Sequence, residues 1–242
     1  MRCSSILTLV AAIPLVAALP GGSFNLNWLD SIARRGSDAL RTGMAVCDPS
    51  QAQLPQGFEA LGPPSEGLTL AHVALGRGTQ NYTCDTSNPS SAPKAGGAIA
   101  TLFNMTCAAA QSSNLIHWLP RVALSLPVPV STRAADNVDM LMSGHHLFTS
   151  LTTPFFNLDT ANHEFGTVMC DGKNAVKTPA PGDAAKGYNG LGSVPWLRLT
   201  AVEGNYKEVY RVDTAGGVAP KTCDGQAATF QVQYAANYYF YH

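Results

Sequence analysis

The sequence predicts an all-β domain, an antiparallel β-sandwich or a barrel, preceded by an N-terminal helical or irregular arm. Two observations predict this fold. First, apolar side chains occupy every second position near the C-terminus, at Phe230, Val232, Tyr234, Ala236, Tyr238 and Phe240. Second, shorter segments with a period of two recur upstream, separated by clusters of Gly, Pro and Asn. Because successive side chains of a strand point to opposite faces, this pattern indicates half-buried strands joined by turns.

The composition excludes several classes of function. The chain has 242 residues with 15 Lys and Arg against 16 Asp and Glu, and only 13% of its residues are charged. Soluble domains usually have roughly 25%. Since no basic cluster is available to neutralise phosphates, we expect no nucleic-acid partner. The apolar share of 45% is sufficient for a folded core, so the composition is not that of a disordered chain.

The N-terminus predicts secretion. Residues 1–18 have a positive start at Arg2, an uncharged apolar run, and small residues at Val16 and Ala18. This arrangement is typical of a signal peptide that is cleaved after Ala18. The apolar run is too short for a membrane span, which needs about 20 residues. We therefore expect a secreted, extracellular protein with no membrane span.

Residues 19–65 are interpreted as an N-terminal arm and residues 66–242 as a single β domain. Within the arm, the segment Phe24–Ile32 repeats apolar residues at helical spacing and leads into the pair Arg34–Arg35. We interpret this pair as an exposed part of an N-terminal helix. The alternative is a pro-segment that a protease of the secretory pathway removes after Arg35.

Seven segments of the β domain are expected to be strands, because alternation and turn signals delimit them. They are Thr79–Cys84, Ile99–Cys107, Val122–Leu126, Leu147–Leu151, Trp196–Val202, Glu208–Thr214 and Phe230–Tyr241. In the second segment, Ile99 and Phe103 are expected to face inward together with Cys107.

Two sequons predict N-linked glycosylation, at Asn81 and at Asn104. In a strand, Asn81 lies on the face opposite Cys84, and Asn104 lies on the face opposite Cys107. Both glycans would then point outward from strands whose cysteines point inward. This coincidence predicts a Cys84–Cys107 disulfide between two strands that pack through their inner faces.

Three further cysteines remain after removal of the signal peptide. Cys47 is expected to pair with Cys223, which would tie the arm to the segment before the last strand. In an oxidising compartment an odd number of cysteines leaves one unpaired. We expect this to be Cys170, as a buried and inert thiol.

The residues able to carry chemistry form no recognisable catalytic motif. His146 and His163 are the candidates for zinc or copper ligation, because imidazole suits both metals. Arg211 and Asp213, two residues apart on an expected strand, would share a face and form an ion pair. The candidate catalytic residues are therefore His146, Arg211 and Asp213. Alternatively, Arg211 binds a carboxylate of a substrate.

Aromatic side chains supply candidates for ligand binding. Trp196, Tyr239 and Tyr241 are candidates for stacking against sugar rings, and packing between sheets is the alternative interpretation. The nearest match to a dinucleotide-binding loop, around Gly76 and Gly78, lacks its third glycine and runs into an expected strand instead of a helix. We therefore expect no cofactor.

Several segments of the β domain carry a resemblance to a known family. They are 73–84 (VALGRGTQNYTC), 97–103 (GAIATLF), 144–148 (GHHLF), 194–199 (VPWLRL), 209–217 (VYRVDTAGG) with 220–223 (PKTC), and 232–241 (VQYAANYYFY). Together they resemble the domain of unknown function 3455 family of secreted fungal and bacterial proteins, over residues 66–241. The resemblance implies no activity. Fungal members are often labelled malate dehydrogenase, a label that the missing dinucleotide-binding signature does not support.

The sequence thus predicts a secreted glycoprotein whose β domain binds a surface or a ligand without catalysis. The expected partner is a cell-wall or extracellular polysaccharide, or a small ligand. The alternative is a hydrolase or a metal-assisted enzyme with its site near His146, Trp196 and Arg211.

Overall fold

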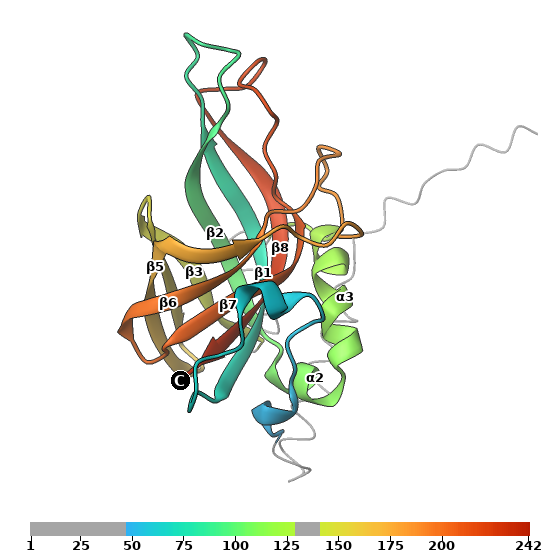
Figure 1. Ribbon diagram of the computed structural model, residues 1–242, viewed down its shortest axis with the longest axis vertical. Coiled ribbons are helices and arrows are strands. Elements are labelled where there is room, and N and C mark those ends of the chain that lie inside the picture. The colour runs from blue at the N-terminus through green and yellow to red at the C-terminus, as the bar shows by residue number, and fades with distance from the viewer. Residues whose placement is uncertain (1–46, 129–140) are drawn as a thin grey trace, which may run out of the picture.

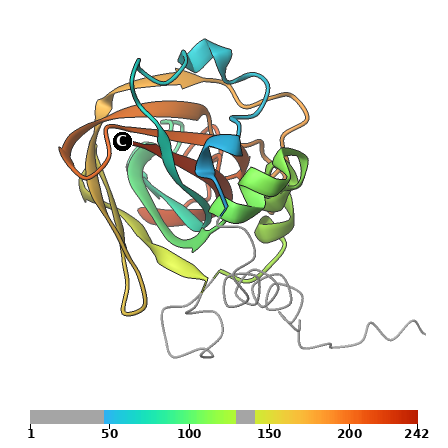
Figure 2. The same ribbon diagram turned by 90° about the horizontal axis from the view of Figure 1, so that it is seen from below.

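The computed structural model describes residues 47–128 and 141–242, and it confirms the predicted all-β class (Figure 1). Eight antiparallel strands follow one another around a closed barrel, in which the last strand returns to pair with the first. Figure 2, turned by 90°, shows the strands as a ring with the helices outside it. Of the two predicted forms the barrel is the correct one, and its closure leaves no free sheet edge.

The strands are β1 Leu70–Thr83, β2 Lys94–Asn104, β3 Met142–Ser150, β4 Thr153–Asp159, β5 Glu164–Thr178, β6 Trp196–Gly204, β7 Glu208–Gly216 and β8 Thr229–Tyr241. The helices are α2 Thr106–Gln111 and α3 Ser113–Leu124, preceded by the 3₁₀ turns η1 Pro49–Gln51 and η2 Phe58–Leu61. The expected signal peptide and the Arg34–Arg35 pair lie outside the described residues. No helix in the described ranges is long and apolar enough to cross a membrane.

Alternate side chains of the strands fill the interior of the barrel. The predicted inner face of the last strand is confirmed, since buried side chains of β8 lie there at Val232, Tyr234, Ala236, Tyr238 and Phe240. They pack against apolar side chains from β1, β2 and β4 to β7. This interior is one of two apolar cores of the domain.

The ladder between β1 and β8 closes the barrel. It extends along the full length of β1, from Leu70 opposite Tyr241 to the end of the strand. Gly76 of β1 faces the Tyr238 ring, and a Cβ atom added at Gly76 would lie 2.6 Å from that ring. A glycine is therefore needed here because the β8 ring occupies the space that a side chain of β1 would fill.

From Ala235 onward the outer face of β8 is also buried, so the prediction of a half-buried strand holds only for its first half, where Gln231 and Gln233 are exposed. Ala235, Tyr239 and Tyr241 belong to a second apolar cluster outside the barrel wall. Ile116 and Leu119 of α3 complete this cluster and cover the strand from outside. The predicted sugar-stacking residues Tyr239 and Tyr241 are therefore packing residues.

The segment Val122–Leu126, expected to be a strand, instead contains the end of helix α3. The Ser112 hydroxyl caps the N-terminus of the helix by accepting a hydrogen bond of 3.3 Å from the Leu115 amide. One face of the helix is buried, at Ile116, Leu119, Pro120, Ala123 and Leu124. The prediction failed because a short apolar run does not by itself distinguish a strand from a buried helix.

Arg77 of β1 attaches the C-terminal end of α3 to the barrel. Its buried guanidinium donates hydrogen bonds to the carbonyls of Leu124 and Leu126, at 3.2 and 2.8 Å. It also donates to the Tyr234 carbonyl of β8 at 3.2 Å. The last carbonyls of a helix have no partner within the helix, so Arg77 satisfies them and joins α3 to two strands.

The inner face of β2 is the opposite of the predicted one. Ala98, Ala100 and Leu102 fill the barrel interior, whereas Ile99 is exposed. The barrel accepts small alanines here because the large rings of β8 occupy most of its interior. The chain then leaves the sheet, and Cys107 lies in α2 outside the barrel instead of on a strand.

The described residues form two disulfides, but their partners differ from the prediction. Cys47 is bonded to Cys107, with Cα atoms 5.2 Å apart. Cys84 is bonded to Cys223, with Cα atoms 5.5 Å apart. The predicted pairs Cys84–Cys107 and Cys47–Cys223 are therefore wrong. Helix α2 carries Cys107 to the outside of the barrel, where the arm passes, and the β1–β8 ladder brings the end of β1 beside the loop before β8. Cys170 is free and buried, as predicted.

Peptide mapping without reduction should find one linked pair with Cys84 and Cys223 and another with Cys47 and Cys107. Burial raises the pKa of the Cys170 thiol to about 12, so this thiol should react with alkylating reagents only after unfolding. A peptide that links Cys84 to Cys107 would contradict the structure.

Replacing both Cys84 and Cys223 by alanine should lower the free energy of unfolding by about 5 kcal/mol, because the bridge closes a loop with a sequence separation of 139 residues. Urea denaturation of the variant and the wild type measures this difference.

Candidate functional site

A groove on the outside of the barrel brings together distant parts of the chain. It lies between the arm, α3, the loop 181–185 and the wall formed by β6 and β7, and its volume is about 570 Å³. Figure 1 shows α3 beside β7 and β8. Its polar lining includes the side chains of Gln53, Asn114, His117, Arg121 and Asp213, beside the rings of Trp118 and Trp196. We call it the α3–β7 groove.

Side-chain hydrogen bonds fix the arm that forms one wall of the groove. The Ser65 hydroxyl donates to Glu208 Oε1 of β7 at 2.6 Å. The Tyr210 hydroxyl donates to the Gly62 carbonyl at 2.9 Å. Because both strand residues belong to β7, the end of the arm is attached to the strand that carries Asp213.

A β-bulge in β7 turns Asp213 toward α3. The pairing of β7 with β8 changes register between Val212 and Ala215. Asp213 has a left-handed φ of 50° and is alone in this among the described non-glycine residues. This conformation is uncommon for residues other than glycine, and Asp and Asn tolerate it best. Arg211 and Asp213 therefore point to opposite sides of the barrel wall, and the predicted shared face and ion pair are wrong.

Asp213 holds His117, a residue that the sequence did not single out. Oδ2 of Asp213 accepts hydrogen bonds from His117 Nδ1 at 3.0 Å and from Asn237 Nδ2 at 2.9 Å. Because a carboxylate only accepts, Nδ1 carries a proton, and Nε2 of the neutral imidazole keeps its lone pair. No spacing motif pointed to this pair, since its two members lie 96 residues apart.

The two tryptophans of the groove have different surroundings. Trp196, the predicted stacking residue, is only 3% exposed, and its indole Nε1 has no hydrogen-bond partner among the described residues. Trp118 is 57% exposed, and the Arg121 guanidinium lies 4.7 Å from the centre of its ring. Trp118 is therefore the ring available to a ligand. Trp118 and Arg121 are three residues apart, and this spacing places their side chains next to each other only in a helix.

His146 lies inside the barrel as a packing residue. Its ring stacks on Phe156 with centroids 4.2 Å apart, and its Nδ1 donates to the Phe155 carbonyl at 3.0 Å. Burial lowers the pKa of His146 to about 4, and the nearby Arg211 cation lowers it as well. His146 is therefore neutral at neutral pH.

His163, the second candidate metal ligand, stacks on Phe165 with ring centroids 5.2 Å apart. Within the described ranges, no three His, Cys, Asp or Glu side chains are grouped so that they could hold a metal ion. The predicted pair of His146 and His163 therefore gains no further ligand from this part of the chain.

Arg211 points into the barrel, toward the tyrosines of β8. The hydroxyls of Tyr234 and Tyr238 are hydrogen-bonded to each other at 2.9 Å. Burial raises the pKa of both hydroxyls, and the Arg211 cation opposes this effect. His146 and Arg211 thus belong to the interior, whereas Trp196 belongs to the outer groove. The predicted site near these three residues is not formed.

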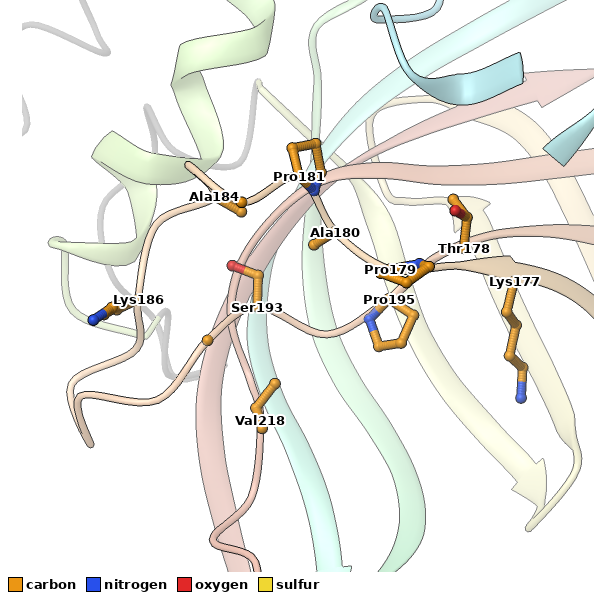
Figure 3. A pocket seen from close by; sticks show the side chains of 12 residues that line it. Lys177, Thr178, Pro179, Ala180, Pro181, Ala184, Lys186, Ser193, Pro195 and Val218 are labelled. Carbon is orange, nitrogen blue, oxygen red and sulfur yellow. The ribbon is translucent and has the colours of Figure 1, made fainter. Parts of the chain in front are cut away.

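A second hollow, of about 670 Å³, adjoins the groove (Figure 3). Prolines of the loop between β5 and β6 line it, with Lys177 and Lys186 at its opposite ends. Pro181 and Ala184 line both hollows. None of the described residues that line the second hollow is an acid or a histidine, so it extends the groove without adding an acid–base pair.

The family match covers the whole barrel and the helices that form the groove. A family described as protein of unknown function (DUF3455) matches residues 64–242. The chain belongs to the DUF3455 family. Searches of the curated proteins and of the solved structures found no match to it. The DUF3455 description carries no activity.

His146→Asn should reduce the loss of stability on acidification. The unfolded chain binds a proton at His146 near pH 6.5 and the folded chain only near pH 4, so this stability is present above pH 6.5 and is lost as the pH falls toward 4. The asparagine amide can still donate to the Phe155 carbonyl but does not titrate. The difference in the free energy of unfolding between pH 7 and pH 5 should shrink by about 2 kcal/mol.

Urea denaturation at the two pH values measures this difference. His72, whose pKa burial also lowers to about 4, contributes equally to both proteins. An unchanged pH dependence in the variant would contradict the buried, neutral His146.

Proposed function

We propose that the protein is a secreted β-barrel domain that binds a hydroxyl-rich ligand, such as an extracellular polysaccharide, in the α3–β7 groove. The observation that carries the proposal is the Trp118 ring, 57% exposed at a groove with polar walls. The flat apolar face of an indole suits the C–H side of a sugar ring. Leu115 and Val122 on the same helix are exposed as well, so the ring lies within an apolar surface that a ligand can cover.

The polar lining supports a ligand with many hydroxyl groups. Gln53, Gln56 and Asn114 line the groove, and each side-chain amide offers both hydrogen-bond donors and an acceptor. Arg121 adds donors with a fixed geometry. A few such polar groups beside aromatic and apolar walls are typical of ligand sites. The low charge of the chain, 13% of its residues, agrees with an uncharged ligand.

Secretion is part of the proposal, and the two disulfides support it because they form in oxidising compartments. Glycosylation of Asn81 and Asn104 belongs to it as well. Asn81 lies near the end of β1, beyond the buried part of the strand, and is partly exposed, which supports its accessibility. Oδ1 of Asn104 accepts a hydrogen bond of 3.0 Å from the Thr106 amide, so its conformation is fixed at the end of β2.

The alternative of an enzyme built on His146, Trp196 and Arg211 loses its support. The first and the last of these side chains face the barrel interior, whereas Trp196 packs in the outer cluster. Of the two hollows described above, the groove is lined by Trp196 alone among the three and the second hollow by none of them, so a substrate in either hollow would not contact all three.

Trp118→Ala should weaken polysaccharide binding at least tenfold, about 1.4 kcal/mol, because the variant loses the stacking surface. The binding assay is a calorimetric titration of the full secreted chain with soluble xylan, β-glucan and mannan, after a pull-down on their insoluble forms. Because the ring is largely exposed, the unfolding temperature should stay within about 2 °C of that of the wild type.

Tyr188→Ala is the matched control, since Tyr188 is 65% exposed and lies outside the lining of the groove. This variant should bind as the wild type does. The proposal fails if the wild type binds none of the polysaccharides, or if Trp118→Ala binds as tightly as Tyr188→Ala.

A further inference from the structure

We propose that the α3–β7 groove is also a hydrolytic site, in which His117, held by Asp213, acts as the general base that activates water against an acyl ester of the bound ligand. This activity rests on the proposed function, because the groove must hold a hydroxyl-rich ligand before an ester on that ligand can be cleaved. It goes beyond binding, because it names a reaction class, ester hydrolysis, and a catalytic residue, His117.

The hydrogen bonds orient His117 as a base. Its Nδ1 donates to Oδ2 of Asp213 at 3.0 Å, which leaves the lone pair of Nε2 for a substrate or a water molecule. The carboxylate is held in turn by Asn237, whose amide donates to Oδ2 at 2.9 Å and to the Ile116 carbonyl at 2.7 Å. A base that a third group orients is the arrangement that catalytic sites use to activate water or a hydroxyl.

The backbone of β7 is shaped to place Asp213 here. In a regular strand Asp213 would share the inner face with Arg211, and the bulge with its left-handed φ of 50° turns it outward. Strained conformations of this kind concentrate at functional sites. A structural contact between α3 and β7 needs no such bulge, because Leu119 and Val212 already join the two elements in an apolar cluster.

Burial differs between the two partners in the way that a general base requires. The side chain of His117 is 25% exposed, whereas that of Asp213 is 7% exposed. The base is thus open to the groove, and its carboxylate is shielded from water. Because charges interact more strongly where water is excluded, Asp213 stabilises the imidazolium that forms when His117 takes up a proton.

In the proposed step, Nε2 of His117 takes a proton from water while the water oxygen forms a bond to the acyl carbon of the ester. The bond between that carbon and the alcohol oxygen of the ligand then breaks, and the proton on Nε2 passes to the departing oxygen. The products are a carboxylic acid and a free hydroxyl, and His117 returns to its neutral form. Arg121 lies one helical turn after His117 in the groove lining. Its Nη2 donates to the Asp183 carbonyl at 2.6 Å, and its other N–H groups remain for the charge that develops on the acyl oxygen.

The groove suits an ester better than a glycosidic bond. Cleavage of a glycosidic bond normally requires two carboxyl groups that face it. Two carboxylates, Asp183 and Asp213, are found among the described residues that line the groove. Asp213 is already engaged by His117 and Asn237, which leaves one carboxylate. Ester hydrolysis needs a single positioned base and water.

The test uses the full secreted chain with chemically acetylated forms of xylan, β-glucan and mannan, and measures the release of acetate. His117→Gln should lower kcat at least about 100-fold, because the amide cannot accept a proton from water. The affinity for the unacetylated polysaccharide should fall much less than kcat, because glutamine keeps a polar side chain in the groove lining, and this difference separates catalysis from binding.

Two further variants test the assigned roles. Asp213→Asn keeps a side chain that tolerates the left-handed backbone, and it should lower kcat at least about tenfold because a neutral amide does not stabilise the imidazolium. In His117→Ala, added imidazole should restore part of the rate, which a merely structural role of His117 would not produce. His242→Gln, which changes an exposed histidine outside the groove, is the matched control and should keep the wild-type rate.

The outcomes distinguish the two proposals. If the wild type binds a polysaccharide but releases no acetate from its acetylated form, the hydrolytic activity is overturned and the binding function stands. The activity is also overturned if His117→Gln or Asp213→Asn folds normally and keeps the full rate. A wild type that binds no polysaccharide overturns both proposals. If His117→Gln does not fold, the rate of Asp213→Asn decides.

Discussion

The pairing of β1 with β8 is the constraint on which the rest of the structure depends. The two strands stand at opposite ends of the β domain, yet they pair along the whole of β1. Their ladder satisfies backbone groups that an open sheet would leave at two edges. It also sets the large rings of β8 inside the barrel, where Gly76 leaves room for Tyr238, and it brings Cys84 beside the loop that carries Cys223.

The closure of the barrel also determines whether a ligand has room inside the barrel or outside it. The interior of an eight-stranded barrel is just wide enough for side chains or for one small ligand. Buried rings such as Phe156, Tyr234 and Phe240 occupy it here. The groove forms instead on the outside, where α3 covers β7 and β8. Asn237 of β8 connects the three elements, because its amide donates both to Ile116 of α3 and to Asp213 of β7.

Much of the barrel could be predicted from alternation, because the side-chain period of a strand is local. The strands expected at Trp196–Val202 and Glu208–Thr214 begin at the same residues as the observed strands β6 and β7. Each observed strand ends two residues later than expected. The segment Val122–Leu126 was misassigned, since a short apolar run fits a helix equally well. His117 and Trp118 were missed for the same reason, because their spacing along the chain gains meaning only on a helix.

The sequence by itself determined the β class, the inner face of β8, the number of disulfides and the free Cys170. Each of these follows from a local period or from a count of residues. The tertiary structure alone decided which cysteines pair and that His117 meets Asp213. These contacts join segments far apart in the chain, and they depend on how the barrel closes, where α3 packs, and how the bulge in β7 turns one carboxylate outward. The outward direction of Asp213 cannot be predicted from the sequence period. The period assumes strict alternation of side chains, and the left-handed φ of this one residue reverses that alternation.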